Sequence, residues 1–281
     1  MGEVAPPGTV AVIGLGLIGL SVAGAARRRW PGVRIVGVDQ PGVLRHPAVV
    51  TTVDVGATAP AASQDADLVV VATPVDVTVG LLPALASVLP PDTPVVDTAS
   101  LKGPVVAAAG ASGLRGFIGG HPMAGNAGQG PGAASADLFD GRPWILTGRR
   151  DAAAAGAIAA FVEGLGARVA WLDDAATHDR LMAAISQVPQ VVASALMVVV
   201  GESAGAQGLG LAGPGLRDTT RLAASPAGLW EGLLPANAGN VAPLLRALAD
   251  LLRQTADTLE TEGAVRRLFE TANRWKASVP D

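Results

Sequence analysis

Short apolar runs alternate with Ala- and Leu-rich stretches of helical length from Thr9 to Leu172. Runs that are apolar on consecutive positions, such as Leu68 to Ala72, are typical of strands buried on both faces of a sheet. This alternation predicts strand–helix units that build a parallel sheet. We expect strands at 10–13, 34–38, 68–72, 94–96, 117–119, 144–146 and 169–172, and covering helices at 18–29, 77–89 and 151–165.

After Leu172 only helical periodicity remains. Asp173 and Asp174 are expected to open a long helix that continues through Leu181 and Ile185. Farther along, leucines recur at helical spacing and form an apolar stripe on one helix face. The stripe consists of Leu244, Leu248, Leu251, Leu252 and Leu259. This stripe is either part of a domain core or a seam between two subunits. The change from strand–helix units to helices alone predicts an α/β domain at 1–173 followed by an all-α domain at 174–281.

Composition excludes several classes of protein. Hydrophobic residues make up 49% of the 281 residues and charged residues only 16%, so the chain can bury a core. A net charge of -4 argues against nucleic acid as a partner. The absence of Cys and Tyr excludes disulfides, thiolate metal sites and tyrosine-based dehydrogenase chemistry. The three histidines lack the spacing of paired metal ligands, so no metal is expected.

No apolar stretch is expected to be long enough for a membrane helix. The most apolar run, Val191 to Val200, falls short of the roughly 20 residues that such a helix needs. The first residues also lack the basic region of a signal peptide. The sequence therefore predicts a cytoplasmic protein without a membrane segment.

A glycine-rich turn follows the first expected strand. It reads Gly14-Leu15-Gly16-Leu17-Ile18-Gly19, and Asp39 ends the next strand about 20 positions later. The first glycine allows a tight turn, the second lets a pyrophosphate approach the backbone, and the third lets helix and strand pack closely. An acidic residue at position 39 accepts hydrogen bonds from ribose hydroxyls and repels a 2'-phosphate, which favours NAD over NADP. The predicted cofactor-binding residues are Gly14, Gly16, Leu17, Ile18, Gly19 and Asp39.

Polar residues follow three further strands, where the carboxyl ends of parallel strands form a ligand crevice. Thr73 and Pro74 are either cofactor contacts or a plain turn, and Lys102 either lines the crevice or simply begins a helix. His121 stands between two glycines and a proline. An imidazole there suits a general base, because histidine titrates near neutral pH.

Six blocks in this order resemble the prephenate and arogenate dehydrogenase family of tyrosine biosynthesis. They are Gly14 to Gly19, Asp97 to Lys102, His121 to Gly125, Leu138 to Gly141, His178 to Arg180 and Arg217 to Arg221. The resemblance implies a Rossmann-type nucleotide-binding domain, an all-α dimerisation domain through which two subunits pair, and an active site between domains. It also implies NAD-dependent oxidation at carbon 4 of a cyclohexadiene, with loss of the ring carboxylate as carbon dioxide.

The resemblance assigns roles to individual residues. His121 matches the histidine that takes the proton from the carbon-4 hydroxyl, and Ser100 matches the serine that hydrogen-bonds at the same locus. Arg221 matches the arginine that binds the substrate carboxylate, which its planar donor fork suits. We expect His178 and Asp179 to play a structural part, such as helix capping.

One block departs from the family pattern. The family usually carries two histidines where this chain has Gln187 and Gln190, and glutamine cannot become cationic near pH 6. We interpret the change as altered substrate choice. Besides prephenate or arogenate, the alternatives are 4-amino-4-deoxyprephenate as the substrate and a non-catalytic NAD-binding regulator. A relative of 3-hydroxyisobutyrate dehydrogenases would need a lysine between Asp179 and Gly201, and the chain has none there.

Overall fold

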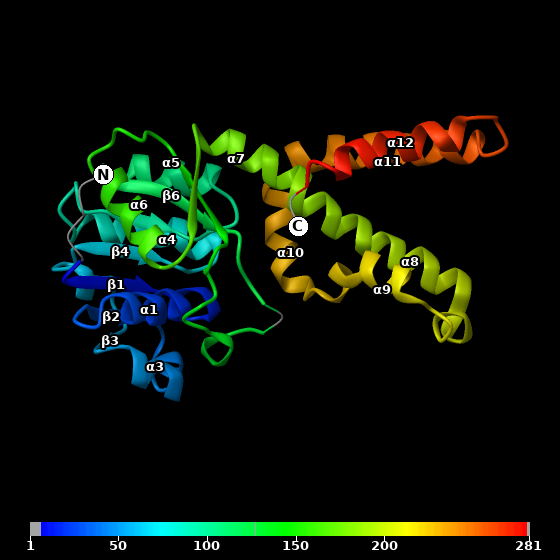
Figure 1. Ribbon diagram of the computed structural model, residues 1–281. Coiled ribbons are helices and arrows are strands. Elements are labelled where there is room, and N and C mark those ends of the chain that lie inside the picture. Colours follow the sequence, from blue (N-terminus) through cyan, green and yellow to red (C-terminus); the bar gives the residue numbers. More distant parts are fainter. Residues whose placement is uncertain (1–6, 127, 280–281) are drawn as a thin grey trace. The chain divides into compact units, whose positions relative to one another are not determined.

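The computed structural model describes residues 7–126 and 128–279, which form two compact units that meet in sequence between Met182 and Ala183 (Figure 1). The first unit is α/β and the second is helical, which confirms the predicted fold class. Contacts group helix α7 (Ala175–Met182) with the first unit. The domain boundary predicted after residue 173 stays a prediction.

The first unit is built on one sheet with the strand order β3-β2-β1-β4-β5-β6-β7-β8. Strands β1 to β6 run parallel, and the crossover from β3 to β4 reverses the direction of winding beside β1. In such a sheet, ligands bind outside the carboxyl ends of the strands at that reversal. The strands are β1 (Thr9–Ile13), β2 (Arg34–Val38), β3 (Val55–Ala57), β4 (Leu68–Val71), β5 (Val95–Asp97), β6 (Phe117–Pro122), β7 (Pro143–Thr147) and β8 (Arg168–Leu172).

The last two strands correct the prediction of a fully parallel sheet. Strand β7 runs antiparallel to β6, and β8 runs parallel to β7. A parallel return needs a crossover, usually a helix, and the described residues between β6 and β7 contain only a short 3₁₀ turn at Pro131–Ala133. Strand β6 is also longer than expected, because its first residues pair with β5 whereas Gly119 to Pro122 pair with β7.

Helices cover both faces of the sheet, and alternate residues of β1 enter two separate cores. Val10 and Val12 belong to the core shared with α1 and α6, whereas Ala11 and Ile13 belong to the core shared with α4 and α5. All four residues are at most 2% exposed, as the consecutive apolar pattern predicts. The helices of this unit are α1 (Leu17–Arg29), α2 (Pro41–Leu44), α3 (Pro47–Thr52), α4 (Val75–Ala86), α5 (Gly103–Ala111), α6 (Ala155–Gly164) and α7 (Ala175–Met182).

Only helices follow β8 among the described residues, and the helix predicted to begin near Asp174 is present. Asp174 accepts the N–H of Thr177 (2.6 Å), as an N-cap residue does. Helix α7 continues through a turn of π-helix, Ala183–Gln187, into α8. The helices that follow are α8 (Val188–Leu209), α9 (Pro214–Thr219), α10 (Ala227–Ala236), α11 (Ala238–Asp257) and α12 (Ala264–Lys276).

The stretch Ala175–Leu209 is long and apolar enough, by length and composition alone, to cross a membrane. Its most apolar 18-residue window has a mean hydropathy of 1.8, so the expectation that no stretch reaches this length was wrong on these criteria. The reason is that Ser, Gln and Gly interrupt the apolar residues without lowering their average enough. Only 22% of that window is buried within the chain.

The leucine stripe of α11 is exposed in the single chain. Leu244, Leu251 and Leu252 are 38%, 44% and 60% exposed, so the interpretation as a domain core is wrong for these residues. Phe269 and Trp275 on α12 are also exposed. Apolar surface of this kind favours the alternative interpretation, a seam between subunits.

Candidate active site

The glycine-rich turn between β1 and α1 has the geometry that its sequence predicts. Gly14 adopts φ +89°, and a Cβ there would lie 2.5 Å from the carbonyl oxygen of Ala72. A Cβ on Gly19 would lie 1.8 Å from the carbonyl oxygen of Gly14, so only glycine lets the helix pack this close. A Cβ on Gly16 would meet no atom within 4 Å, which leaves room for a pyrophosphate beside the backbone.

The residues around this turn fit a dinucleotide. Helix α1 begins at Leu17, followed by Ile18, and the positive end of its dipole faces the glycine-rich turn. The first turn of the helix carries no acidic residue that would neutralise this positive end. Asp39 follows β2 and accepts the N–H groups of Leu15 and Gln40, each at 2.6 Å. Its carboxylate is therefore held against the glycine-rich turn.

Thr73 and Pro74 lie beside the same turn. The Cγ2 of Thr73 would be 2.8 Å from a Cβ on Gly14, and its hydroxyl pairs with that of Thr78 (2.8 Å). Pro74 occupies the N-cap position of α4. Both residues thus border the predicted cofactor site, and their contact with a cofactor stays a prediction.

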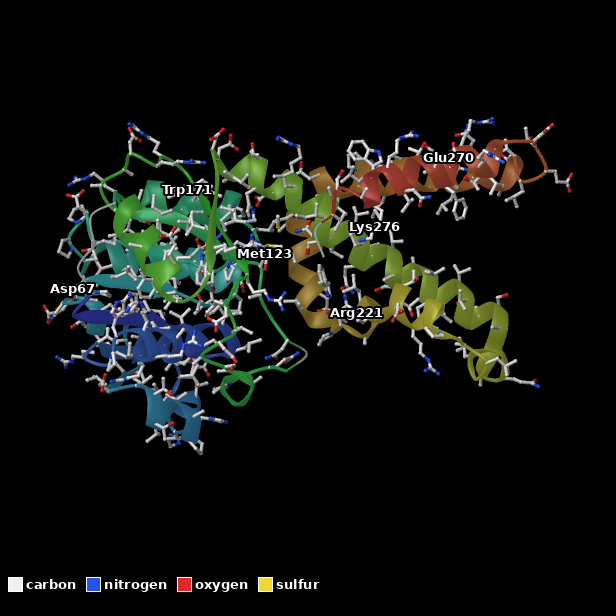
Figure 2. The ribbon with its side chains drawn as sticks, viewed as in Figure 1. Asp67, Met123, Trp171, Arg221, Glu270 and Lys276 are labelled. Atoms are coloured by element: carbon white, nitrogen blue, oxygen red, sulfur yellow. The ribbon has the colours of Figure 1, made fainter. Side chains whose placement is uncertain are left out.

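His121 lies within strand β6, where it pairs with Ile145 of β7. The sequence predicts that this strand ends at Gly119 and that His121 lies just past it, whereas the observed strand continues to Pro122. Met123, labelled in Figure 2, extends the pairing, because its N–H donates to the carbonyl oxygen of Pro143 (2.8 Å). The backbone of His121 is therefore fixed on both sides by the sheet.

A chain of polar contacts runs from His121 into the protein. Its Nδ1 lies 2.9 Å from Nε2 of His178, whose Nδ1 lies 2.8 Å from Oδ1 of Asp179. The carboxylate of Asp179 also accepts the N–H groups of Lys102 and Gly103, each at 2.8 Å, and so caps helix α5. His178 is fully buried. The predicted structural role of this pair is consistent with the cap, but the contact with His121 was not anticipated.

Of the two alternatives for Lys102, the structure favours the start of a helix, because the residue occupies the N-cap position of α5. Its side chain is completely buried, so the prediction that it lines the crevice is wrong. The ammonium forms a short ion pair with Asp97 and donates to the carbonyl oxygen of Gly120 at 2.5 Å. Asp97 in turn accepts the N–H groups of Ala99 and Gly120, each at 2.9 Å. The pair is thus satisfied on both sides, and it supports the backbone next to His121.

These neighbours determine the charge of the imidazole. Burial lowers the pKa of His121 well below its ordinary value, and the neighbouring Lys102 and His178 lower it further, while Asp179 acts in the opposite direction. Although burial raises the pKa of Asp179, hydrogen bonds from His178 and from two backbone N–H groups lower it below the usual carboxylate value. At neutral pH the imidazole of His121 is therefore neutral and the buried carboxylate of Asp179 is ionised, with His178 between them.

Ser100 follows β5 in the segment between Asp97 and Lys102 and is partly exposed. It thus belongs to the same unit as His121. The remaining predicted site residues, Arg221, Gln187 and Gln190, belong to the second unit.

In the second unit, the two glutamines are buried and already hydrogen-bonded. Gln187 lies in the π-helical turn and accepts from the side-chain amide of Asn237 (2.7 Å). Gln190 donates to the carbonyl oxygen of Leu222 (2.8 Å) and borders a pocket of about 700 Å³ that Trp230 and Glu231 also line. Arg221 is exposed at the start of the turn between α9 and α10 (Figure 2).

Sequence reasoning missed two partners in the first unit. The sequence predicts no role for Asp97 by itself, although an acidic residue at the end of a buried strand signals a buried partner. Nor does it predict a contact between His178 and His121, because the two residues are 57 positions apart in the chain. Among the described residues, no group of three or more His, Cys, Asp or Glu side chains is placed to hold a metal ion.

A glycine-rich turn opening a helix, an acidic residue after the second strand and a doubly wound sheet together define a nucleotide-binding protein of the dehydrogenase class. Residues 22–171 match the family model for the prephenate dehydrogenase nucleotide-binding domain, and residues 174–273 match that for the prephenate dehydrogenase dimerization domain. The chain belongs to the prephenate dehydrogenase family, and it is a dehydrogenase. The predicted class of cofactor site and the resemblance stated from the sequence are thereby confirmed.

Individual relatives agree with this assignment. The chain is 32% identical to a prephenate dehydrogenase of Lactococcus lactis over 81% of its own length and 64% of that protein. It is 33% identical to a cyclohexadienyl dehydrogenase of Zymomonas mobilis, covering 86% of this chain and 85% of the relative. The structure resembles that of a prephenate dehydrogenase from A. aeolicus in complex with hydroxyphenyl propionate and NAD+, with 25% identity, a TM-score of 0.87, and coverage of 99% and 100% of the two chains.

Proposed function

We propose that this dehydrogenase catalyses the NAD-dependent oxidative decarboxylation of prephenate or arogenate to the aromatic product. The observation that carries the proposal is the position of the His121 imidazole, held by strand pairing and by His178 in the unit that contains the glycine-rich turn. A general base of this kind is what the oxidation of an alcohol requires. The complex of the A. aeolicus relative with hydroxyphenyl propionate and NAD+ supports the same reaction class.

The glycine-rich turn fits a dinucleotide, and Asp39 favours NAD among the dinucleotides. Its carboxylate lies against the turn, where it would accept hydrogen bonds from ribose hydroxyls and repel a 2'-phosphate. The residues proposed to hold the cofactor are Gly14, Gly16, Leu17, Ile18, Gly19, Asp39, Thr73 and Pro74. When bound, NAD supplies the acceptor for the hydride that leaves carbon 4.

Aromatisation and loss of carbon dioxide drive the reaction forward, so the protein's own residues need only position the substrate and accept one proton. His121 takes the proton of the carbon-4 hydroxyl, and Ser100 forms a hydrogen bond in the same part of the site, near that hydroxyl. Arg221 binds a substrate carboxylate through its planar donor fork. Lys102 has no direct role in this scheme, since its ammonium is occupied by Asp97 and Gly120.

A second substrate, 4-amino-4-deoxyprephenate, is favoured by one specific observation. Gln187 and Gln190 are buried neutral amides where the family usually carries histidines, and both are hydrogen-bonded within the second unit. Gln190 borders the pocket of about 700 Å³, and its amide does not gain positive charge at low pH, so this pocket suits a substrate with a different polar substituent. Because the chain belongs to a dehydrogenase family, a non-catalytic regulator is not proposed.

The test is a panel of three substrates with two cofactors. Purified protein is mixed with prephenate, arogenate or 4-amino-4-deoxyprephenate, and nicotinamide reduction is followed at 340 nm with NAD or NADP. We expect turnover of prephenate or arogenate that is faster with NAD. A tenfold or larger preference for the amino substrate would move the assignment to the alternative, and no turnover on any of the three would overturn both.

The activity should persist on the acid side of the ordinary histidine pKa. His121 must be neutral to accept a proton, and burial lowers its pKa well below 6.5 in the folded chain. Lys102, His178 and Asp179 are the charged or titratable groups that face it. We therefore expect the acid limb of the kcat/KM profile well below pH 6.5, and an acid limb assigned to His121 at or above pH 6.5 would contradict this. In the unfolded chain the same imidazole takes up its proton near pH 6.5, so its contribution to stability is present above that pH and is lost as pH falls.

The dimerization domain supports a homodimer that forms through the C-terminal helices. The exposed residues that such a contact would cover include Leu252 on α11 and Phe269 on α12. Covering them removes apolar side chains from water, which favours association. The cytoplasmic location and the absence of membrane and nucleic-acid partners stay predictions from the sequence.

A further inference from the structure

The hydrogen bonds around His178 determine which nitrogen of each ring carries a proton. Asp179 lies 2.8 Å from Nδ1 of His178, and an ionised carboxylate can only accept, so this Nδ1 must carry hydrogen. When both rings are neutral, Nε2 of His178 has a lone pair and accepts from Nδ1 of His121 at 2.9 Å. His121 then has its proton on Nδ1, and its Nε2 is left free to take a proton.

We propose that His178 and Asp179 are positioning residues that hold His121 in the tautomer with hydrogen on Nδ1, so that its Nε2 serves as the base. The inference rests on the proposed function for its kinetic effect, but the tautomer itself is a property of the free protein. An imidazole in solution prefers the opposite tautomer, with hydrogen on Nε2. In that tautomer Nε2 has no lone pair available and cannot accept a proton. The pair therefore provides what the sheet alone cannot, since strand pairing fixes the backbone of His121 but not its ring.

The surroundings of the pair fit this role. His178 is fully buried, so water does not compete for its Nε2. Asp179 is anchored by the backbone N–H groups of Lys102 and Gly103 at the start of α5, which fixes the direction of its carboxylate. The two imidazole rings meet edge to face, with centroids 5.1 Å apart and planes inclined by 61°. A carboxylate, a histidine and a second histidine thus form one line of contacts that ends at the proposed base.

The pair also provides a place for positive charge once the base has reacted. When a substrate proton bonds to Nε2 of His121, the ring carries hydrogen on both nitrogens. The Nδ1–H bond of His121 can then break as a new N–H bond forms at Nε2 of His178, so that one proton moves and none is lost. The carboxylate of Asp179 stabilises the resulting imidazolium through the hydrogen bond that it already accepts from Nδ1.

The tautomer can be observed directly, because the chain has only three histidines. Ring ¹⁵N shifts and long-range ¹H–¹⁵N correlations distinguish the two neutral tautomers in protein without substrate. We expect hydrogen on Nδ1 of His121 in the wild type, a shift toward hydrogen on Nε2 in His178→Leu, and retention of the wild-type tautomer in His178→Gln, whose amide oxygen can still accept. Finding hydrogen on Nε2 of His121 in the wild type would overturn the proposal.

Kinetics provide the second measurement. His178→Leu should lower kcat by about 10- to 100-fold, as the loss of an orienting partner does elsewhere, with little change in the KM for NAD. His178→Gln should recover part of that loss. Equal kcat in wild type and His178→Leu, with both folded by circular dichroism, would also overturn the proposal.

His46 gives a matched control. Its Nδ1 accepts the N–H of Ala48 at the start of α3, and it takes no part in the line of contacts that ends at His121. His46→Gln should leave both the tautomer of His121 and kcat unchanged. If the expected tautomer is found but none of the three cyclohexadienes is turned over, the proposed function fails and the positioning pair stands. The two failures are thereby distinguished.

Discussion

Replacing His121 by Asn should lower kcat by about 10² to 10⁴-fold, the usual contribution of a general base. Asparagine is close to histidine in size and its amide can still hydrogen-bond to His178, but it cannot accept a proton at neutral pH. The ladder of β6 and β7 does not depend on the side chain, so the variant should fold. Steady-state kinetics with the best substrate of the panel, together with thermal unfolding, measure both expectations.

His46→Asn is the matched control for this variant, because it makes the same chemical change at a histidine that only caps helix α3. It should keep the wild-type kcat. Binding of NAD, followed by quenching of tryptophan fluorescence, should be similar in His121→Asn and wild type, since the glycine-rich turn is untouched. A kcat within about threefold of wild type in His121→Asn would remove this residue from the mechanism.

Replacing Lys102 by Met should lower the free energy of unfolding by about 3–5 kcal/mol, the usual effect of removing one partner of a buried ion pair. Lys102 and Asp97 are both fully buried, and the ammonium also donates to the carbonyl oxygen of Gly120. Methionine fills most of the volume, so the loss comes mainly from leaving the carboxylate of Asp97 charged and without its cation. Urea unfolding followed by circular dichroism measures it.

The double variant Lys102→Met with Asp97→Asn separates charge from packing. An asparagine oxygen can still accept one of the two N–H groups that Asp97 binds, and no buried charge remains. Its loss of stability should be clearly smaller than that of Lys102→Met alone. Arg115→Met breaks an exposed ion pair of the same unit, with Asp92, and should have a much smaller effect. Equal losses in Lys102→Met and Arg115→Met would contradict the argument.

Local signals explain what the sequence predicted well. The turn from Gly14 to Gly19 needs glycine for reasons that act over a few residues, namely a positive φ and a close approach to neighbouring backbone. Consecutive apolar residues likewise mark β1, β2 and β4, which are buried on both faces. By contrast, β3 has three residues with a glycine in the middle, which is too short for any periodicity to be recognised.

Long-range contacts explain what was missed. Whether a lysine after a strand turns outward or inward depends on what lies behind it, and for Lys102 that is Asp97 and the carbonyl oxygen of Gly120. The contact between His121 and His178 likewise joins two segments whose separation in sequence carries no signal. The direction of β7 was missed because a strand pattern reads the same in either direction.

The reversed strand β7 has a consequence for how such an enzyme can diversify. Its pairing with Gly119 to Pro122 places the proposed base on a rigid ladder, which is encoded entirely before Ala183. Substitutions in the helices that follow, which carry Gln187 and Gln190, leave that ladder intact. Such substitutions can therefore change which substrate is accepted without changing the residues proposed to transfer the proton.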